Sequence, residues 1–317
     1  MTLRIVGNEY LLDDANMGDL IDVIVSPKIE KLIGNLAEES AVAENGGVVP
    51  NEAANRYVNG IGQQLVRHSK RADFGYKFGI VANKAPNAFA LPNGSLYVTM
   101  GLLRLLRNEA QLANVLGHEV SHVTEKHTVH QLALNMGTLL FLQLADALSK
   151  GDKESRKAAK EMVFNLIANG YSRENEWEAD EKGQKLAAKA GWDPNGMVDI
   201  MAVFQTLEKD HPKGVEEYMR SHPYATERMA EALERAQSLP RGELNGERYQ
   251  AFLGLLGIPR TEIAQSPVQT ASKILPGAPP TATEPIGIAI PSWIWPLAGI
   301  AVVGTGALLL LPKLLRR

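Results

Sequence analysis

The chain reads HEVSH at residues 118–122, inside an apolar-periodic run that begins near Glu109. On an α-helix, residues four apart lie one turn above each other, so His118 and His122 can reach the same small cation. Glu119 lies about 100° further round such a helix, close enough to take a proton from a water that the metal activates. The pentapeptide therefore predicts a helix that carries a zinc site.

Composition narrows the classes of protein and of metal site that fit. The 317 residues are 45% hydrophobic and 22% charged, which is typical of a packed globular chain. A formal net charge of -3, without a block of like charges, predicts no nucleic-acid partner. The chain has no cysteine, which excludes disulfides and thiolate zinc ligands. Any zinc must therefore be held by histidine and carboxylate.

The N-terminal part of the sequence favours helices. Apolar residues recur at three- and four-residue steps over about 17–36, where Pro27 is expected to divide the helix, and again over 51–68. These patterns predict a helical region, 1–70, that packs on a catalytic domain at 71–258.

A small sheet is expected next. Apolar residues alternate over 74–80, and short extended segments at 87–91 and 96–99 are separated by the turn sequence PNGS at 92–95. Asn108, with a glutamine three residues later, resembles a capping box that opens the helix carrying HEVSH. The pentapeptide thus has the helical context that a metal site of this kind requires.

A third metal ligand is expected from the sequence YSRENEWEAD at 171–180, which leads into another helix. Positions 176, 180, 183 and 187 share one face and hold two carboxylates followed by two small residues. That face is suited to close packing on the HEVSH helix, with Glu176 as the third ligand. Asp180 is then placed to accept the free ring N–H of a zinc histidine. The alternative for Asp180 is an ordinary surface carboxylate.

The expected roles of the other histidines depend on the residues around them. His222 could donate to a developing oxyanion or approach the metal as an occasional fourth ligand, with Arg228 orienting it or stabilising the same charge. A histidine before proline can equally be only a loop residue. His127 and His130 are expected in surface or capping roles, because five and eight residues beyond His122 they point partly away from the metal.

Apolar segments near and beyond the catalytic domain raise the question of a membrane. Residues 132–148 are apolar but interrupted by polar side chains, which favours a buried helix or a lid over a membrane span. The Pro-, Ala- and Thr-rich stretch 259–291 is typical of a linker. A membrane anchor is predicted at 292–312, in which the 19 uncharged residues 293–311 would span about 28 Å as a helix, followed by a basic tail at 313–317.

The side of the membrane is left open. The basic tail favours a cytoplasmic C-terminus, with the catalytic domain on the opposite side. Residues 1–16 carry no recognisable secretory signal, which favours a cytosolic domain on a single-pass C-terminal anchor.

Four ordered motifs resemble one family. HEVSH, YSRENEWEAD, SHPYATER at 221–228 and the preceding NAFALPNGSLYVTMGLL at 87–103 are similar to the membrane-associated gluzincin metallopeptidases, which include the HtpX and BepA proteases and the CAAX prenyl endopeptidases. The resemblance covers roughly 74–229, about half the chain.

This resemblance implies a role for each matching residue. It implies one Zn²⁺ per chain held by His118, His122 and Glu176, with Glu119 as general base. It also implies functional roles for His222 and Arg228. The segment near the start of the small sheet resembles a strand that binds substrate backbone by strand addition. Its residues are Asn87, Ala88, Phe89 and Ala90.

The expected protein is an α+β, predominantly helical, zincin-like chain with a small sheet and one C-terminal transmembrane helix. The expected function is zinc-dependent endopeptidase activity on polypeptide substrates, in quality control of membrane or envelope proteins. The alternative is a non-catalytic zinc chaperone or adaptor with the same fold. Glu119 argues against it, since a structural site has no use for a base beside an open position. The sequence leaves the oligomeric state open.

Overall fold

The computed structural model describes residues 3–6, 9–12 and most of 25–259. Within the last span it leaves out 137–140, scattered positions between 142 and 159, 161–169, 211–215, 217–219 and 224. The predicted linker, membrane helix and basic tail lie beyond the described residues, apart from the first residue of the linker, and they stay predictions. Among the described residues, no helix is both long and apolar enough to cross a bilayer.

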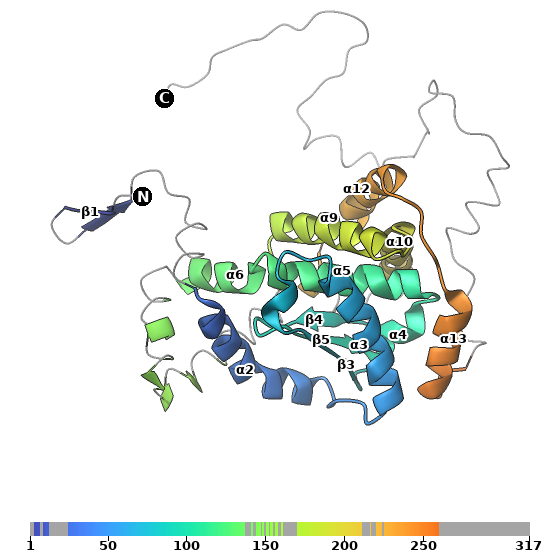
Figure 1. The fold of residues 1–317 in the computed structure, drawn as a ribbon, viewed down its shortest axis with the longest axis horizontal. Helices are drawn as coiled ribbons and strands as arrows, with labels where there is room; N and C mark the ends of the chain where they lie inside the picture. The colour runs from blue at the N-terminus through green and yellow to red at the C-terminus, as the bar shows by residue number, and fades with distance from the viewer. Residues whose placement is uncertain are drawn as a thin grey trace, which may run out of the picture. The chain divides into compact units, whose positions relative to one another are not determined.

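A three-stranded sheet lies beside the helices and confirms the expected α+β class (Figure 1). Its strands are β3 (Lys77–Val81), β4 (Ala88–Ala90) and β5 (Ser95–Thr99), in the order β3-β5-β4. β5 runs parallel to β3 and antiparallel to β4. The expected PNGS turn joins β4 to β5, and its Gly94 has φ 87°, a conformation that favours glycine. Phe74 precedes the sheet in a 3₁₀ turn, Ala72–Phe74, so the first strand starts later than the alternation predicts.

The two faces of the sheet pack in different clusters, as the two-residue period of a strand requires. One face contributes to the central core with α3 and α5, through Phe78, Ile80, Ala88, Ala90, Leu96 and Val98. The other face contributes to a second cluster, with residues of α2, through Val81, Phe89 and Tyr97. The sheet is therefore apolar on both faces, which explains why its strands are nearly continuous hydrophobic runs.

The N-terminal region is only partly helical. Strands β1 (Leu3–Val6) and β2 (Glu9–Leu12) form an antiparallel hairpin, which the helical expectation for 1–70 missed. Further along, α2 (Pro27–Glu44) and α3 (Glu52–Val66) follow the predicted helices. Pro27 begins α2, where a fixed φ and a missing N–H suit a first helical turn. The part of the predicted helix before it, 17–24, lies outside the described residues.

The helix that carries HEVSH is α5 (Glu109–Thr124), and every one of its residues is buried. The Asn108 side chain accepts the backbone N–H of Gln111, and the Gln111 side chain accepts that of Arg107. These bonds satisfy donors that the helix start would leave unpaired, much as the predicted capping box would. The remaining helices are α4 (Met100–Leu105), α6 (His127–Met136), α9 (Arg173–Lys189), α10 (Asn195–Asp210), α12 (Ala225–Ser238) and α13 (Gly246–Leu255).

The apolar segment at 132–148 is partly described, and its described side chains favour the buried-helix expectation. Leu132, Phe141, Leu144 and Leu148 are buried in the same cluster as Ile33 of α2. This packing joins the segment to the folded domain.

Helix α9 lies along α5 (Figure 1), and two glycines set how closely the backbones approach. A Cβ atom on Gly183 would lie 2.4 Å from the backbone nitrogen of His118, and one on Gly117 would lie 2.6 Å from the carbonyl oxygen of Gly183. Since no side chain fits between them, the small-residue face expected on α9 does dock on the HEVSH helix. This contact brings Glu176 and Asp180 against the two histidines.

Replacing Gly183 with alanine should therefore separate the two helices. We expect the free energy of unfolding to fall by about 1–3 kcal/mol, the usual range for overpacking a core. Gly60→Ala in α3 is the matched control, because a Cβ there meets nothing within 4 Å and should stabilise the helix by up to about 1 kcal/mol. Urea denaturation of both variants measures the difference, and equal stabilities would contradict the close-packing argument.

Candidate metal centre

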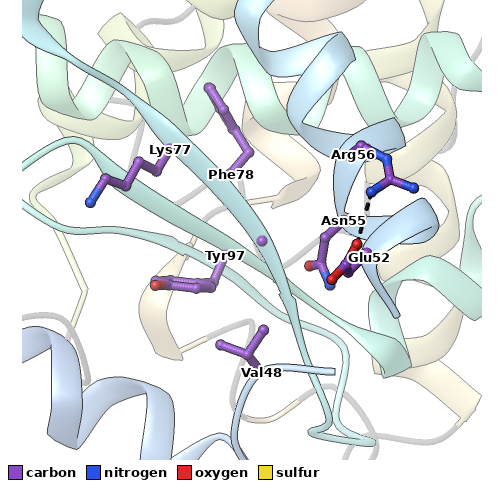
Figure 2. Close-up of a pocket in the computed structure, with 8 residues that line it drawn as sticks. Val48, Glu52, Asn55, Arg56, Lys77, Phe78 and Tyr97 are labelled. Carbon is purple, nitrogen blue, oxygen red and sulfur yellow. Dashed lines mark hydrogen bonds and ion pairs between the residues drawn. The ribbon is translucent and has the colours of Figure 1, made fainter. Parts of the chain in front are cut away.

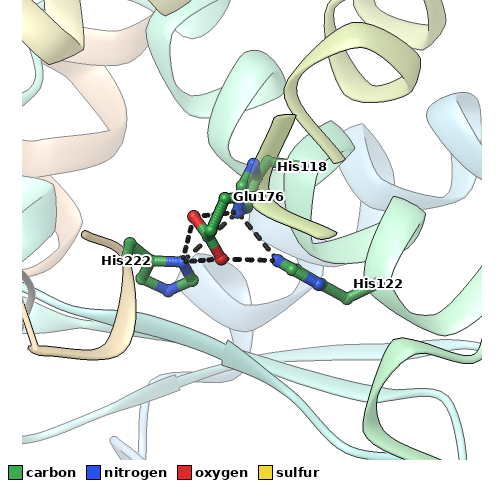
Figure 3. Close-up of side chains that lie close together, drawn as sticks. All are labelled: His118, His122, Glu176 and His222. Atoms are coloured by element: carbon green, nitrogen blue, oxygen red, sulfur yellow. Dashed lines mark hydrogen bonds and ion pairs between the residues drawn. The ribbon is translucent and has the colours of Figure 1, made fainter. Parts of the chain in front are cut away.

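Four buried side chains from three parts of the chain converge on one point (Figure 3). His118 and His122 come from α5, Glu176 from α9, and His222 from the segment before α12. One potential ligand atom from each lies within 4.8 Å of all the others. Three imidazole nitrogens and a carboxylate form a donor set that zinc accepts.

The potential ligand atoms of this cluster lie close to one another. The Nε2 atoms of His118 and His122 are 2.9 Å apart, and the Glu176 carboxylate oxygens lie 3.6 Å and 3.3 Å from them. The Nδ1 atom of His222 lies 3.2 Å from Glu176 Oε1 and 3.3 Å from His118 Nε2. A cation among these atoms would be bound by all four groups.

Asp180 shows that the donor set fits a metal. Its Oδ1 atom lies 2.9 Å from Nδ1 of His118. A carboxylate only accepts hydrogen bonds, so Nδ1 of His118 carries the proton and, in the neutral ring, Nε2 presents a lone pair to the cluster. Asp180 thus lies where the sequence places it, behind one of the two histidines that are predicted to bind the metal.

Arg228 contacts the carboxylates of both Asp180 and Glu176. Its Nε donates to Asp180 Oδ2 at 2.6 Å and its Nη2 donates to Asp180 Oδ1 at 2.7 Å. Its Nη1 lies 2.5 Å from Glu176 Oε2 and also donates to the carbonyl of Pro223 at 3.1 Å. Arg228 therefore connects the two carboxylates of α9 to the segment that holds His222, which suits the orienting role considered for it.

The electrostatics of Glu176 and His122 favour the protonation states that metal ligands need, whereas the pKa of His222 is raised to about 9 because the nearby Glu176 and Glu119 carboxylates outweigh the effect of burial. Burial opposes ionisation of Glu176, but the charges of Arg228 and of the nearby histidines hold its pKa well below the usual range. Burial also lowers the pKa of His122, which keeps its ring neutral. An ionised carboxylate beside a neutral imidazole is ready to bind a cation without first losing a proton.

Glu119 sits beside the cluster, buried, with its Oε1 atom 3.6 Å from Nε2 of His222. Among the described residues, its other carboxylate oxygen has no hydrogen-bond partner. Burial raises the pKa of Glu119, partly offset by His222 and His118. A buried carboxylate with a raised pKa and a free oxygen is suited to exchanging protons.

Strand β4 lies at the edge of the described sheet, next to the cluster. The carbonyl oxygen of Ala88 lies 3.3 Å from Nε2 of His222, and the Ser221 hydroxyl donates to Asn87 Oδ1 at 3.3 Å. The side chains of Phe89 and Ala90 point into the two apolar clusters. The loop of His222 therefore lies over the edge of β4 that the sequence predicts for substrate binding.

Comparison of the sequence with known proteins assigns the chain to a family. The sequence profile of peptidase family M48 matches residues 52–236, more than half of the chain. The chain belongs to peptidase family M48. Among curated relatives, the beta-barrel assembly-enhancing protease of Escherichia coli K12 is 28% identical over 200 residues, covering 58% of this chain and 39% of the relative. This chain thus spans less than half the length of that relative.

Two further relatives carry a mitochondrial name. The mitochondrial metalloendopeptidase OMA1 of Schizosaccharomyces pombe is 26% identical over 230 residues, covering 72% of this chain and 66% of the relative. The mitochondrial metalloendopeptidase OMA1 of Bos taurus is 33% identical over 149 residues, covering 43% of this chain and 28% of the relative. The M48 match begins at the first residue of α3 and ends within α12, so all four cluster residues lie inside it.

One expectation about this M48 domain is wrong. His127 is neither at the surface nor a cap: it is buried, and its Nδ1 atom lies 2.9 Å from Nδ1 of His122. The expectation assumed a continuous helix, but α5 ends at Thr124, and Lys126 has φ 57°, which turns the chain back. The same reasoning missed Tyr171, whose ring stacks on that of His122 with centroids 3.9 Å apart. The one sequence signal for His127 is that a third histidine stands five residues after the last histidine of HEVSH.

An open pocket of about 460 Å³ lies elsewhere on the M48 domain, over β3 and β5 beside the start of α3 (Figure 2). Its lining residues are Val48, Glu52, Asn55, Arg56, Lys77, Phe78, Gly79 and Tyr97. It shares no residue with the histidine cluster. The open pocket is therefore separate from the residues that the sequence predicts as metal ligands.

Proposed function

We propose that this protein is a zinc-dependent endopeptidase in which His118, His122 and Glu176 hold the metal. The observation that carries the proposal is the convergence of these three donors beside the Glu119 carboxylate. A structural zinc site would not need a free carboxylate oxygen at its edge.

Zinc is the metal proposed because the donor set is nitrogen and carboxylate oxygen in a buried site, and the chain has no cysteine. Bound zinc would polarise the substrate carbonyl and lower the pKa of water at the site. Asp180 and Arg228 would hold the ligands in place, through the bonds to His118 and Glu176 described above.

Glu119 is the proposed general base. Its free oxygen takes the proton of the attacking water and then delivers it to the leaving amine of the peptide. The raised pKa that burial imposes suits both steps, because the carboxyl group must accept a proton and then give it back.

His222 must move for the reaction to proceed. Its Nδ1 lies at the fourth corner of the cluster, and its Nε2 lies against the carbonyl of Ala88 on the edge of β4. A catalytic zinc keeps one position for water, and strand addition requires an unpaired edge. Withdrawal of one loop would open both sites, after which His222 could donate to the oxyanion of the substrate. Substrate backbone would then pair along Asn87, Ala88, Phe89 and Ala90.

The second candidate function is a non-catalytic zinc chaperone or adaptor, in which His222 stays as a permanent fourth ligand. The arrangement in this structure, with four donors in contact, is the observation that favours it. Glu119 favours the peptidase, because a permanently closed site gives its free oxygen no proton to transfer.

The substrates are proposed to be polypeptides, as the names of the M48 relatives imply for those proteins. We further propose a role in the quality control of membrane or envelope proteins, with the domain held at a membrane by the predicted helix at 292–312. This part of the proposal is supported by the sequence pattern and by family membership.

The decisive experiment uses the full chain, purified in detergent, with casein as substrate. We expect slow cleavage that stops when 1,10-phenanthroline removes the metal and returns when stoichiometric Zn²⁺ is added. His222→Ala frees the fourth corner but also removes the proposed oxyanion donor, so we expect it to bind zinc and to cleave casein more slowly than the wild type. Zinc binding without casein cleavage in either protein would favour the chaperone.

A further inference from the structure

The turn after α5 places a third histidine behind the metal cluster. Because α5 ends at Thr124 and Lys126 adopts a left-handed conformation, α6 starts at His127 with its ring folded back toward His122. The two ring centroids are 5.0 Å apart, and the Nδ1 atoms are 2.9 Å apart. His127 does not reach the cluster of ligand atoms itself.

The other nitrogen of His127 meets a carboxylate on α9. Its Nε2 atom lies 3.0 Å from Oε2 of Glu178. Lys182, one turn further along α9, pairs with Oε1 of Glu178 at 2.5 Å and so holds that carboxylate in place. His122, His127 and Glu178 thus form a continuous chain of hydrogen bonds from the cluster to the surface of α9.

The direction of these hydrogen bonds follows from which ring nitrogens carry a proton. A carboxylate accepts, so Nε2 of His127 donates to Glu178, and Nδ1 of the neutral ring is left as an acceptor. The only hydrogen bond that Nδ1 of His127 can then make with His122 is one in which Nδ1 of His122 donates. Nε2 of His122, which faces the cluster, is therefore left with a lone pair.

We propose that His127 is a positioning residue, and that together with Glu178 it sets the tautomer and ring orientation of His122 for metal binding. The inference rests on the proposed zinc site. His118 receives the same support directly from Asp180, whereas His122 receives it through a second imidazole. Tyr171, stacked on His122 at an interplanar angle of 16°, limits rotation of the same ring.

The hydrogen-bonded supports of His118 and His122 differ for a structural reason. Glu178 lies two residues after Glu176 and two before Asp180 on α9, so its side chain leaves the helix on another side and cannot reach His122 directly. The ring of His127 spans this gap. The return of the chain at Lys126 therefore supplies a part of the metal site that the HEVSH helix lacks.

The first test measures zinc affinity by competition with a chromogenic chelator, using the full chain. His127→Phe keeps a ring but removes the acceptor, and we expect affinity to fall about 10- to 100-fold, as for other partners of zinc histidines. His127→Asn places an amide oxygen near the position of Nδ1 and should recover most of that loss. His130→Gln, three residues further along α6, is the control and should bind as the wild type does.

The second test needs no variant and reads the tautomers directly. In the zinc-loaded wild type, long-range ¹H–¹⁵N correlation spectra should show His122 protonated at Nδ1 and His127 protonated at Nε2 alone. A proton on Nδ1 of His127 would overturn the proposal, as would a His127→Phe variant that binds zinc as tightly as the wild type. A wild type that binds no zinc would instead refute the proposed function itself.

Discussion

Replacing Glu119 with glutamine should lower kcat for peptide hydrolysis by about 100- to 10,000-fold, the range that a positioned general base contributes. The amide keeps the size of the side chain but cannot accept the proton of the attacking water. The zinc content should stay that of the wild type, because Glu119 is not among the four clustered donors. Casein cleavage and metal analysis of the same preparation check both statements.

The stability of the same variant provides a separate control. Because burial raises the pKa of Glu119 in the folded chain, its ionised form opposes folding at any pH above that pKa. Removing the charge should therefore leave the Tm of the metal-free protein unchanged or raise it at pH 7. A variant that loses activity together with Tm would show that Glu119 supports the fold, and one that keeps full activity would refute its role as base.

Replacing Glu176 with glutamine should reduce zinc affinity by more than about 100-fold, since loss of a mere outer partner of a ligand already costs 10- to 100-fold. The amide also removes the negative charge beside Arg228, a buried cation that keeps its contact with the Asp180 carboxylate. Hydrolysis should disappear at the zinc concentrations that saturate the wild type.

Chelator competition measures this loss, and Glu174→Gln is the matched control because its exposed side chain lies on the same first turn of α9. The control should bind zinc and cleave casein as the wild type does. If Glu176→Gln kept wild-type affinity, the metal would have to be held by the three histidines of the cluster alone, and the proposed ligand set would be wrong.

Local patterns predicted most of the elements around the site. The cap at Asn108, the PNGS turn and the 3.6-residue periods of α3 and α5 are short-range effects, so each could be located from neighbouring residues. The hairpin at 3–12 and the early end of α5 were missed, because two four-residue strands and a single left-handed lysine leave little periodic signal.

The order of residues along the chain was enough to propose that His118 and His122 face one cation, because helix geometry places residues four apart on one side. The small residues after Glu176 likewise indicated a helix that packs closely on another. Tertiary structure decided which other groups reach those histidines. Asp180, Arg228 and His222 arrive from distant segments, and His127 returns through a turn whose direction no periodicity encodes. The sequence motifs suggest Asp180, Arg228 and His222 as partners but leave their roles open, because which atoms meet depends on how the helices pack.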